Sequence, residues 1–238
     1  MWKAYGDRDA VGYLVLAVKA ILLRYAHLMP ADEIVAEHTE GEFDPDVLHP
    51  VPAWRRAKPI SFCTDWQGQN PDPERETQVS ALWSPETLYL RFECRFRSLF
   101  VFDDSNADGH RDQLWDRDVV EAFLQPDARQ ERFYKEFEVS PNGMWIDLDI
   151  FPGGRANLKS GLRRSVACDD RAREWKAELA IPMKALVTTF DAKAVWRANF
   201  YRVEGSQEPR AYMAWQATNT RNPDFHVPQT FGKLRFSL

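Results

Sequence analysis

The sequence predicts an all-β fold, an antiparallel β-sandwich of the jelly-roll or immunoglobulin-like kind, preceded by a short N-terminal helical appendage. Residues 88–96 alternate between apolar and polar side chains without a break, as in a strand with one buried face. Asn142-Gly143, a strong hairpin signal, stands between two further alternating segments. Turn residues recur at short intervals from residue 31 onward, and almost no segment there has helical periodicity. These features favour short strands joined by tight turns.

The predicted strands follow one another through most of the chain. They are 88–96, 133–139, 144–150, 175–182, 196–203, 211–217 and 232–238. Asn142-Gly143 turns the second of these strands back onto the third, which Pro152-Gly153-Gly154 ends. One helical turn is predicted at 183–187, and 196–203 and 211–217 should pair as a hairpin.

Residues 1–29 have a different pattern. Their apolar side chains recur at helical spacing: Val11, Leu14, Val15, Val18, Leu22 and Tyr25. The apolar run 11–18 is too short for a membrane span, which needs about 20 residues. A signal peptide would need a basic start and a small-residue cleavage site. We expect residues 1–29 to be a helical appendage, or a stretch translated from a start upstream of the natural one, and residues 30–238 to form the β domain.

Charge and cysteine content exclude several functions. The formal net charge is −5, which gives no general electrostatic footprint for nucleic acid or an anionic membrane. The three cysteines, Cys63, Cys94 and Cys168, are widely spaced and form no CxxC pair. An odd number at such spacing is typical of neither a disulfide framework nor a zinc site.

Trp115 and Glu121 are the most informative residue pair. Trp115 stands in a charged loop, and six residues later Glu121 enters a predicted strand. An indole can cover the apolar face of a sugar ring, and a carboxylate accepts strong hydrogen bonds from its hydroxyls. The pair therefore predicts sugar binding. The alternatives are a Trp115 folded onto the core and a Glu121 held in an ordinary ion pair.

Further motifs follow in a fixed order. The first is Trp115, Asp118, Glu121 and Phe123, and the second is Trp175, Ala180, Ile181 and Pro182. Asn199 and Phe200 come next, and the last motif is Trp215, Thr218, Asn219, Pro228, Phe231, Gly232 and Leu234. On these residues the chain, from about Phe43 to its C-terminus, resembles a family 9 carbohydrate-binding module within the DOMON-like β-sandwiches.

The resemblance implies a binding site for a sugar held between two aromatic rings. The first ring and the ligand glutamate of the family fall on Trp115 and Glu121. The second ring falls on Phe225 and the ligand asparagine on Asn222. Phe225 stands where the family pattern has Trp, which implies weaker binding or an altered sugar preference. The family's ligand arginine has three candidates here: Arg91, Arg117 and Arg202.

The resemblance also implies a function. It is that of a non-catalytic module that binds short oligosaccharides or polysaccharide chain ends in carbohydrate catabolism. Such a module needs no cofactor, works beside a separate glycoside hydrolase and lies outside the cytoplasm, although no signal peptide is evident. The alternatives are a hydrolase-associated domain with weak activity on O-glycosyl bonds and a haem-binding electron-transfer domain.

The sequence offers no clear set of residues for either the hydrolase or the haem-binding alternative. Glycoside hydrolysis needs two carboxylates about 5–10 Å apart that flank one bond. Asp118 and Glu121 are three residues apart on a strand, so they point to opposite faces. Glu136 and Glu138 do share a face, but they lie among other charged residues. Haem would need axial ligands from Met144, Met183, Met213 or His226.

Residues 104–109 resemble half of a calcium-binding loop. Asp104, Asn106 and Asp108 place oxygen ligands at alternate positions before Gly109, as a hard cation requires. The glutamate expected at position twelve is absent, because Trp115 stands there. Structural calcium is therefore one interpretation, and a solvated acidic loop is the other.

The polar phases of several predicted strands carry unusually many functional groups. They are Arg91, Glu93, Glu136, Glu138, Trp145, Asp147, Arg197, Asn199 and Tyr201. Two interpretations are open: a solvated sheet face and a shallow hydrogen-bonding platform.

Overall fold

The computed structural model describes residues 32–104 and 109–237. The predicted appendage, residues 1–29, lies outside the described residues, as do Asn106 and Asp108 of the predicted calcium loop. Within the described ranges, helix is confined to α2 (Met183–Leu186) and to short 3-10 segments. No helix in this part of the chain is long and apolar enough to cross a membrane.

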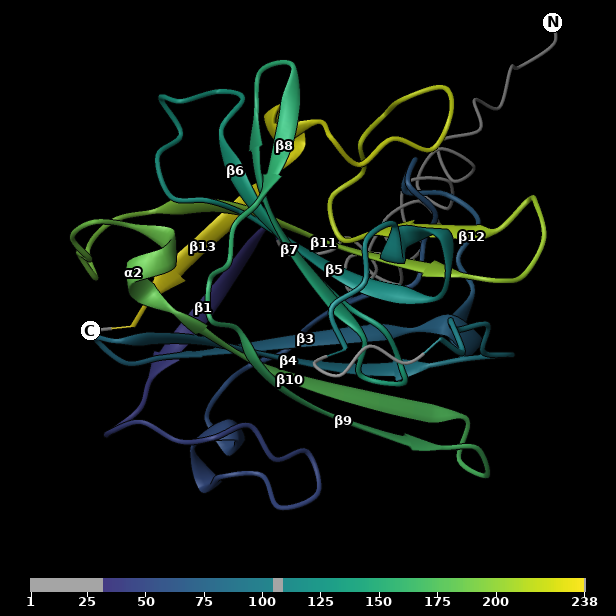
Figure 1. The fold of residues 1–238 in the computed structure, drawn as a ribbon, viewed down its shortest axis with the longest axis horizontal. Coiled ribbons are helices and arrows are strands. Elements are labelled where there is room, and N and C mark those ends of the chain that lie inside the picture. The colour runs from purple at the N-terminus through teal and green to yellow at the C-terminus, as the bar shows by residue number, and fades with distance from the viewer. Residues whose placement is uncertain (1–31, 105–108, 238) are drawn as a thin grey trace, which may run out of the picture. The chain divides into compact units, whose positions relative to one another are not determined.

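Thirteen strands form one curled sheet (Figure 1). They are β1 (Glu33–His38), β2 (Ile60–Phe62), β3 (Thr77–Trp83), β4 (Thr87–Arg95), β5 (Val119–Gln125), β6 (Tyr134–Val139), β7 (Trp145–Phe151), β8 (Gly154–Asn157), β9 (Arg163–Asp169), β10 (Glu174–Pro182), β11 (Trp196–Glu204), β12 (Ala211–Ala214) and β13 (Gly232–Phe236). The strand order is β8-β7-β6-β5-β11-β13-β1-β3-β4-β10-β9, with β12 added on β11 and β2 on β3. The prediction of a mostly β fold is confirmed, and each predicted strand overlaps an observed one.

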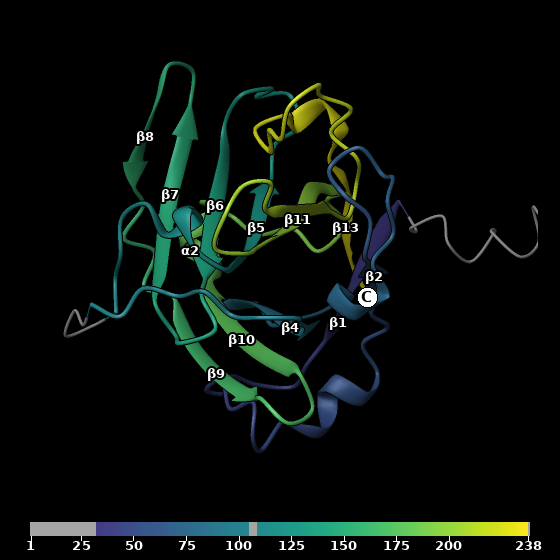
Figure 2. The same ribbon diagram turned by 90° about the vertical axis from the view of Figure 1, so that its right-hand side faces the viewer.

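The main hydrophobic core lies between two parts of this curled sheet. Apolar side chains of β5, β6 and β11 pack there against those of β3, β4 and β10. Phe92 of β4 meets Phe200 of β11 edge to face, with ring centroids 5.9 Å apart. Figure 2 shows β5, β11 and β13 on one side of the interior and β4 and β10 on the other. The alternating side chains of 88–96 explain this arrangement, because they give β4 one continuous apolar face.

The sheet departs from a purely antiparallel arrangement at β1. This strand pairs in parallel with β13 on one side and with β3 on the other. It thereby joins the two parts of the sheet. The sequence prediction included no strand there. The segment 33–38 has only six residues, and three of them, Glu33, Glu37 and His38, are charged or titratable, so it shows no clear alternation.

Two glycines of the predicted motifs occupy positions that require glycine, one in a turn and one beside a buried ring. Gly143 turns the β6–β7 hairpin with φ 85°, and the Ser140 N–H donates to the Met144 carbonyl across the turn at 2.9 Å. At Gly232 a Cβ atom would lie 2.6 Å from the Trp215 ring, so only glycine fits beside this buried indole. The motif residues Trp215 and Gly232 are therefore packing partners.

A second apolar cluster, here called the outer cluster, covers the opposite face of β5, β6, β7 and β11. Its buried members are Leu114, Val119, Phe123, Tyr134, Met144, Ile146, Leu148, Tyr201, Val203, Ala214, Phe225 and Phe231. Loop residues such as Leu114 and Phe225 lie over the strands here. The face that the sequence suggested to be a solvated surface or shallow platform is therefore largely buried.

The strand register also separates members of that predicted polar face. Glu136 pairs with Leu148 and Glu138 with Ile146, whereas Asp147 pairs with Phe137. Cross-strand partners share a face of the sheet. Asp147 therefore lies on the side of Phe137, and the two glutamates lie on the side of the outer cluster.

Candidate functional site

A pocket of about 250 Å³ opens beside the outer cluster. Aromatic walls come from Trp115, Tyr212 and Phe225. The polar lining consists of Asp116, Glu121, Glu136, Arg155, Arg210, Asp224 and His226. The structure thus brings together three residues predicted to bind sugar: Trp115 and Glu121, which are close in sequence, and the distant Phe225.

Trp115 is presented by a short 3-10 turn. Gln113 begins this turn in a left-handed conformation, φ 58°, and Leu114 anchors it by burying its side chain in the outer cluster. The Trp115 indole remains half-buried. The guanidinium of Arg155 lies over this ring, 4.2 Å from its centroid, as in a cation–π contact. Arg155 belongs to β8, an exposed strand, so its side chain has room to move.

Arg210 fixes the loop that carries Trp115. Its guanidinium donates to the backbone carbonyls of Trp115 (2.9 Å), Arg117 (2.7 Å) and Gly205 (3.0 Å). A planar guanidinium can bond three carbonyls in one plane, which a lysine cannot do. Sequence reasoning missed both Arg155 and Arg210, because no local motif marks them.

Phe225 forms the opposite aromatic wall in a fixed orientation. Its ring stacks on Tyr201 at 4.1 Å with an interplanar angle of 11°. Its carbonyl accepts a hydrogen bond from the Tyr201 hydroxyl at 3.0 Å. Tyr212 meets the ring edge-on at 6.2 Å. The ring is buried, so it offers the pocket only part of its surface.

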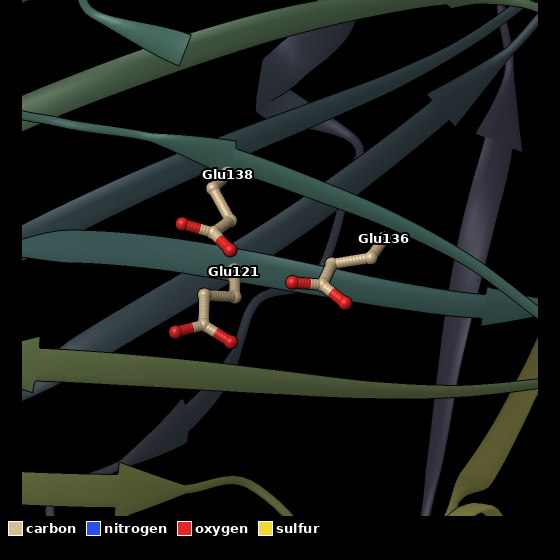
Figure 3. Close-up of side chains that lie close together, drawn as sticks. All are labelled: Glu121, Glu136 and Glu138. Atoms are coloured by element: carbon tan, nitrogen blue, oxygen red, sulfur yellow. The ribbon is translucent and has the colours of Figure 1, made fainter. Parts of the chain in front are cut away.

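Three glutamates, together called the pocket floor here, lie close together on neighbouring strands (Figure 3). Glu121 on β5 pairs directly with Glu138 on β6, and Glu136 lies two residues before Glu138 on the same face. One carboxylate oxygen of each lies within 4.8 Å of the others, and all three side chains are buried. Glu121 and Glu136 line the pocket, whereas Glu138 does not.

Burial and neighbouring charge raise the pKa values of two of these carboxyl groups, Glu121 and Glu138. Burial raises the pKa of Glu121 well above its usual range, the charge of Glu136 raises it further, and Arg210 partly offsets both. Burial and the charges of Glu121 and Glu136 likewise raise the pKa of Glu138, which Arg155 partly offsets. Among described residues, no donor reaches Glu136 Oε2 or either oxygen of Glu138. A proton shared between Glu136 and Glu138, or a cation from outside, would satisfy them.

A second cavity, of about 600 Å³, adjoins the first and shares Arg155 and His226 with it. The β7–β8 hairpin forms much of its wall, including Phe151 and Gly153, and Tyr134 also lines it. Tyr134 and His226 Nδ1 are 2.6 Å apart. Burial, then the charge of Glu136, raises the pKa of Tyr134, so the phenol stays protonated in this hydrogen bond with Nδ1.

Other residues predicted to bind the ligand lie outside this lining. Arg91 is on β4, where it pairs with Glu178. Arg117 packs on Phe100 and Phe102 at 4.4 Å from each ring.

Arg202 and Asn222 also do not line the pocket. Arg202 is fully buried on the inner face of β11 and pairs with Glu204. Asn222 is exposed, and its carbonyl accepts from Thr220 Oγ1 at 2.7 Å. Asp104, the one described residue among the predicted calcium ligands, pairs with Arg111 at 3.1 Å.

Residues 103–236, more than half of the chain, match the sequence model of carbohydrate-binding family 9. An extracellular protein of the fungus Arthroderma benhamiae is 25% identical over 210 residues, which cover 81% of this chain and 91% of that protein. The human UPF0462 protein C4orf33 is 27% identical over 131 residues, or 52% of this chain and 62% of that protein.

Solved structures have the same fold. A Bacteroides uniformis protein proposed to bind carbohydrate superposes with a TM-score of 0.67 at 16% identity, covering 86% of this chain and 99% of that one. A family 9 carbohydrate-binding module from Caldicellulosiruptor kristjanssonii superposes in its cellotriose complex with a TM-score of 0.59. Its glucose complex gives 0.60. Both have 14% identity and cover 86% of this chain, and 93% and 95% of the respective structures.

Proposed function

Because this chain belongs to carbohydrate-binding family 9, as its sequence suggested, we propose that it binds carbohydrate in the pocket between Trp115 and Phe225. The observation that carries the proposal is the convergence of an accessible indole and buried carboxylates on one cavity. The apolar face of a sugar ring packs on Trp115, and its hydroxyls donate to Glu121 and Glu136. Arg155 moves off the indole and turns toward the sugar.

The cellotriose and glucose complexes of the related module support a sugar ligand, and the residues here support its placement. The two packed parts of the curled sheet act as a β-sandwich scaffold. The module works beside a separate glycoside hydrolase outside the cytoplasm, with structural calcium at residues 104–108. The extracellular relative from Arthroderma benhamiae supports the location.

Trp115→Ala should weaken sugar binding about tenfold or more. Burying one aromatic face contributes about 1–2 kcal/mol through area and packing, which corresponds to such a factor. Calorimetric titration with glucan and xylan oligomers measures it. Leu48→Ala, a change at an exposed position outside the pocket lining, is the matched control. Equal affinities of Trp115→Ala and wild type would remove Trp115 from the site.

Affinity should rise with chain length from a monosaccharide to a trisaccharide. The second cavity adjoins the first, so further sugar units extend past Arg155 toward Phe151, which is 37% exposed. Phe151→Ala should weaken trisaccharide binding several-fold and leave monosaccharide binding unchanged. A titration series with oligomers of one to three units tests this. Equal affinity for all lengths would confine the ligand to the smaller pocket.

A further inference from the structure

We propose that the sugar unit over Glu121 and Glu136 carries an ammonium group, so that the ligand class is a 2-amino-2-deoxy sugar such as a glucosamine oligomer. This inference rests on the proposed function, because it places a cationic sugar in the same pocket. It follows from the charge of the pocket floor, the positions of the neighbouring guanidinium groups and the aromatic wall.

Any negative charge on the pocket floor is buried and has no hydrogen-bonded counterion among the described residues. Glu136 lines the pocket, is 3% exposed and has one buried oxygen that accepts no hydrogen bond from the described residues. Both carboxylate oxygens of Glu138, which is fully buried, also accept no hydrogen bond from the described residues. Leaving buried charged groups unpaired is costly, and a ligand cation would remove that cost.

The two arginines of the lining do not fill this role. Arg210 directs its guanidinium to three backbone carbonyls. Arg155 lies on the Trp115 ring, with Asp112 at 3.9 Å. Neither is hydrogen-bonded to the glutamates among the described contacts, although their charges reach Glu121 and Glu138. The lining also holds four carboxylates, of Asp116, Glu121, Glu136 and Asp224, against two guanidinium groups.

The aromatic wall is compatible with a cation. The guanidinium of Arg155 lies 4.2 Å from the centroid of the Trp115 ring. The ammonium of the ligand would take its place, so one cation replaces another on the same ring. An ammonium donates charge-assisted hydrogen bonds of about 2.7–2.9 Å to carboxylates. Glu121 and Glu136 accept these hydrogen bonds. Glu138, which lies next to them but does not line the pocket, contributes its charge at longer range. A sugar hydroxyl in that position would bond the oxygens but leave the charge uncompensated.

A divalent cation is the competing species for three carboxylates. Calcium takes six to eight oxygen ligands. Asp116 and Asp224 add carboxylate oxygens to those of Glu121 and Glu136, but three aromatic rings and two guanidinium groups make up much of the remaining lining. Aromatic faces suit an ammonium, which makes cation–π contacts, better than calcium, which needs oxygen ligands on all sides. The composition of the lining therefore favours the ammonium.

The test compares three trisaccharides on the full chain by calorimetry: glucosamine trimer, its N-acetylated counterpart and glucose trimer. The N-acetylated trimer has the same sugar skeleton as the glucosamine trimer but no charge. The glucose trimer is also uncharged and lacks the acetyl group, so it shows whether the bulk of that group affects binding. The glucosamine trimer should bind about tenfold more tightly than either, which is the difference between charged and neutral hydrogen bonds. Equal or tighter binding of a neutral trimer would overturn the inference and leave the proposed function standing. Failure of all three would overturn both.

Glu136→Gln should reduce the preference for the glucosamine trimer about tenfold, because it removes charge without changing shape. Glu86→Gln, at an exposed position in the β3–β4 turn, should preserve the preference. The wild-type comparison needs no variant, so it stays decisive if Glu136→Gln folds poorly. A parallel titration with calcium chloride and with EDTA covers the competing cation. Calcium binding that depends on Glu136, without any preference for the glucosamine trimer, would contradict the ammonium.

Discussion

Glu204→Gln should lower the free energy of unfolding by about 3–5 kcal/mol, the usual effect of breaking a buried ion pair on one side. Glu204 lies at the end of β11 on the inner side of the sheet. Its Oε2 accepts from Arg202 Nη2 at 2.9 Å, and neither side chain is exposed. Its Oε1 accepts from Arg75 Nε at 2.9 Å and from the Arg97 N–H at 3.1 Å. Glutamine keeps the shape but leaves Arg202 without its hydrogen-bonded carboxylate.

The charge of Arg202 has few other partners. Its Nη1 donates to the Arg95 carbonyl at 3.2 Å, its guanidinium lies 5.3 Å from the Trp175 ring, and its Nε has no acceptor among the described residues. A loss of 3–5 kcal/mol corresponds to a Tm decrease of about 6–20 °C in a domain of this size. Thermal melts followed by circular dichroism measure it.

Asp32→Asn is the matched control. Asp32 pairs with Lys233, but both side chains are at least half exposed, so solvent screens the pair and Tm should stay unchanged. If Glu204→Gln melted as the wild type does, Arg202 would have to find water or another acceptor. That result would contradict the desolvated pair.

The sequence predicted the strands better than the site, for a physical reason. Period-two alternation reports which residues share one strand face, and it located β4, β6, β7, β10 and β11. It does not report which loops cover that face. Arg91 and Glu136 both occupied polar phases, yet Arg91 lies on β4 and Glu136 on β6, beside different loops.

The pocket also depends on contacts between distant segments. Trp115 and Glu121 were predicted because they are six residues apart and belong to one motif. Arg155 and Arg210 reach the same pocket through two hairpins, β7–β8 and β11–β12, whose positions depend on the whole sheet. The glutamate cluster depends on the pairing of Glu121 with Glu138, a register that alternation cannot predict.

Glu138→Gln should stabilise the ligand-free protein at neutral pH, by about 1–3 kcal/mol, or roughly 2–12 °C in Tm. Glu138 faces Glu121 and Glu136 in a buried environment, and among the described residues Arg155 supplies an opposing charge that offsets them in part. A glutamine amide in this position donates to the neighbouring carboxylates, whereas the native carboxylate repels them. Most buried substitutions destabilise a protein, so the direction of this effect is diagnostic.

The stabilisation should depend on pH with a definite sign. Burial and neighbouring charge raise the folded-state pKa of Glu138 above its unfolded value of 4.5. The folded state therefore binds more protons than the unfolded state between those two pKa values, and stability falls as pH rises through this window. The wild type should be more stable at pH 5 than at pH 8, and Glu138→Gln should reduce that difference. Near pH 4.5 the two proteins should converge.

Glu121, Asp118 and Glu178 also have raised pKa values, so the wild-type slope alone cannot be assigned to Glu138. The difference between variant and wild type removes the contributions of Asp118 and Glu178, which lie outside the cluster, and reports Glu138 together with its interaction with Glu121. Melts at pH 5, 6, 7 and 8 should give a difference in Tm that grows with pH for Glu138→Gln and stays flat for Glu86→Gln. A difference that shrinks as pH rises would mean that Glu138 is stabilised in its charged form. The cluster would then already hold a cation in the ligand-free protein.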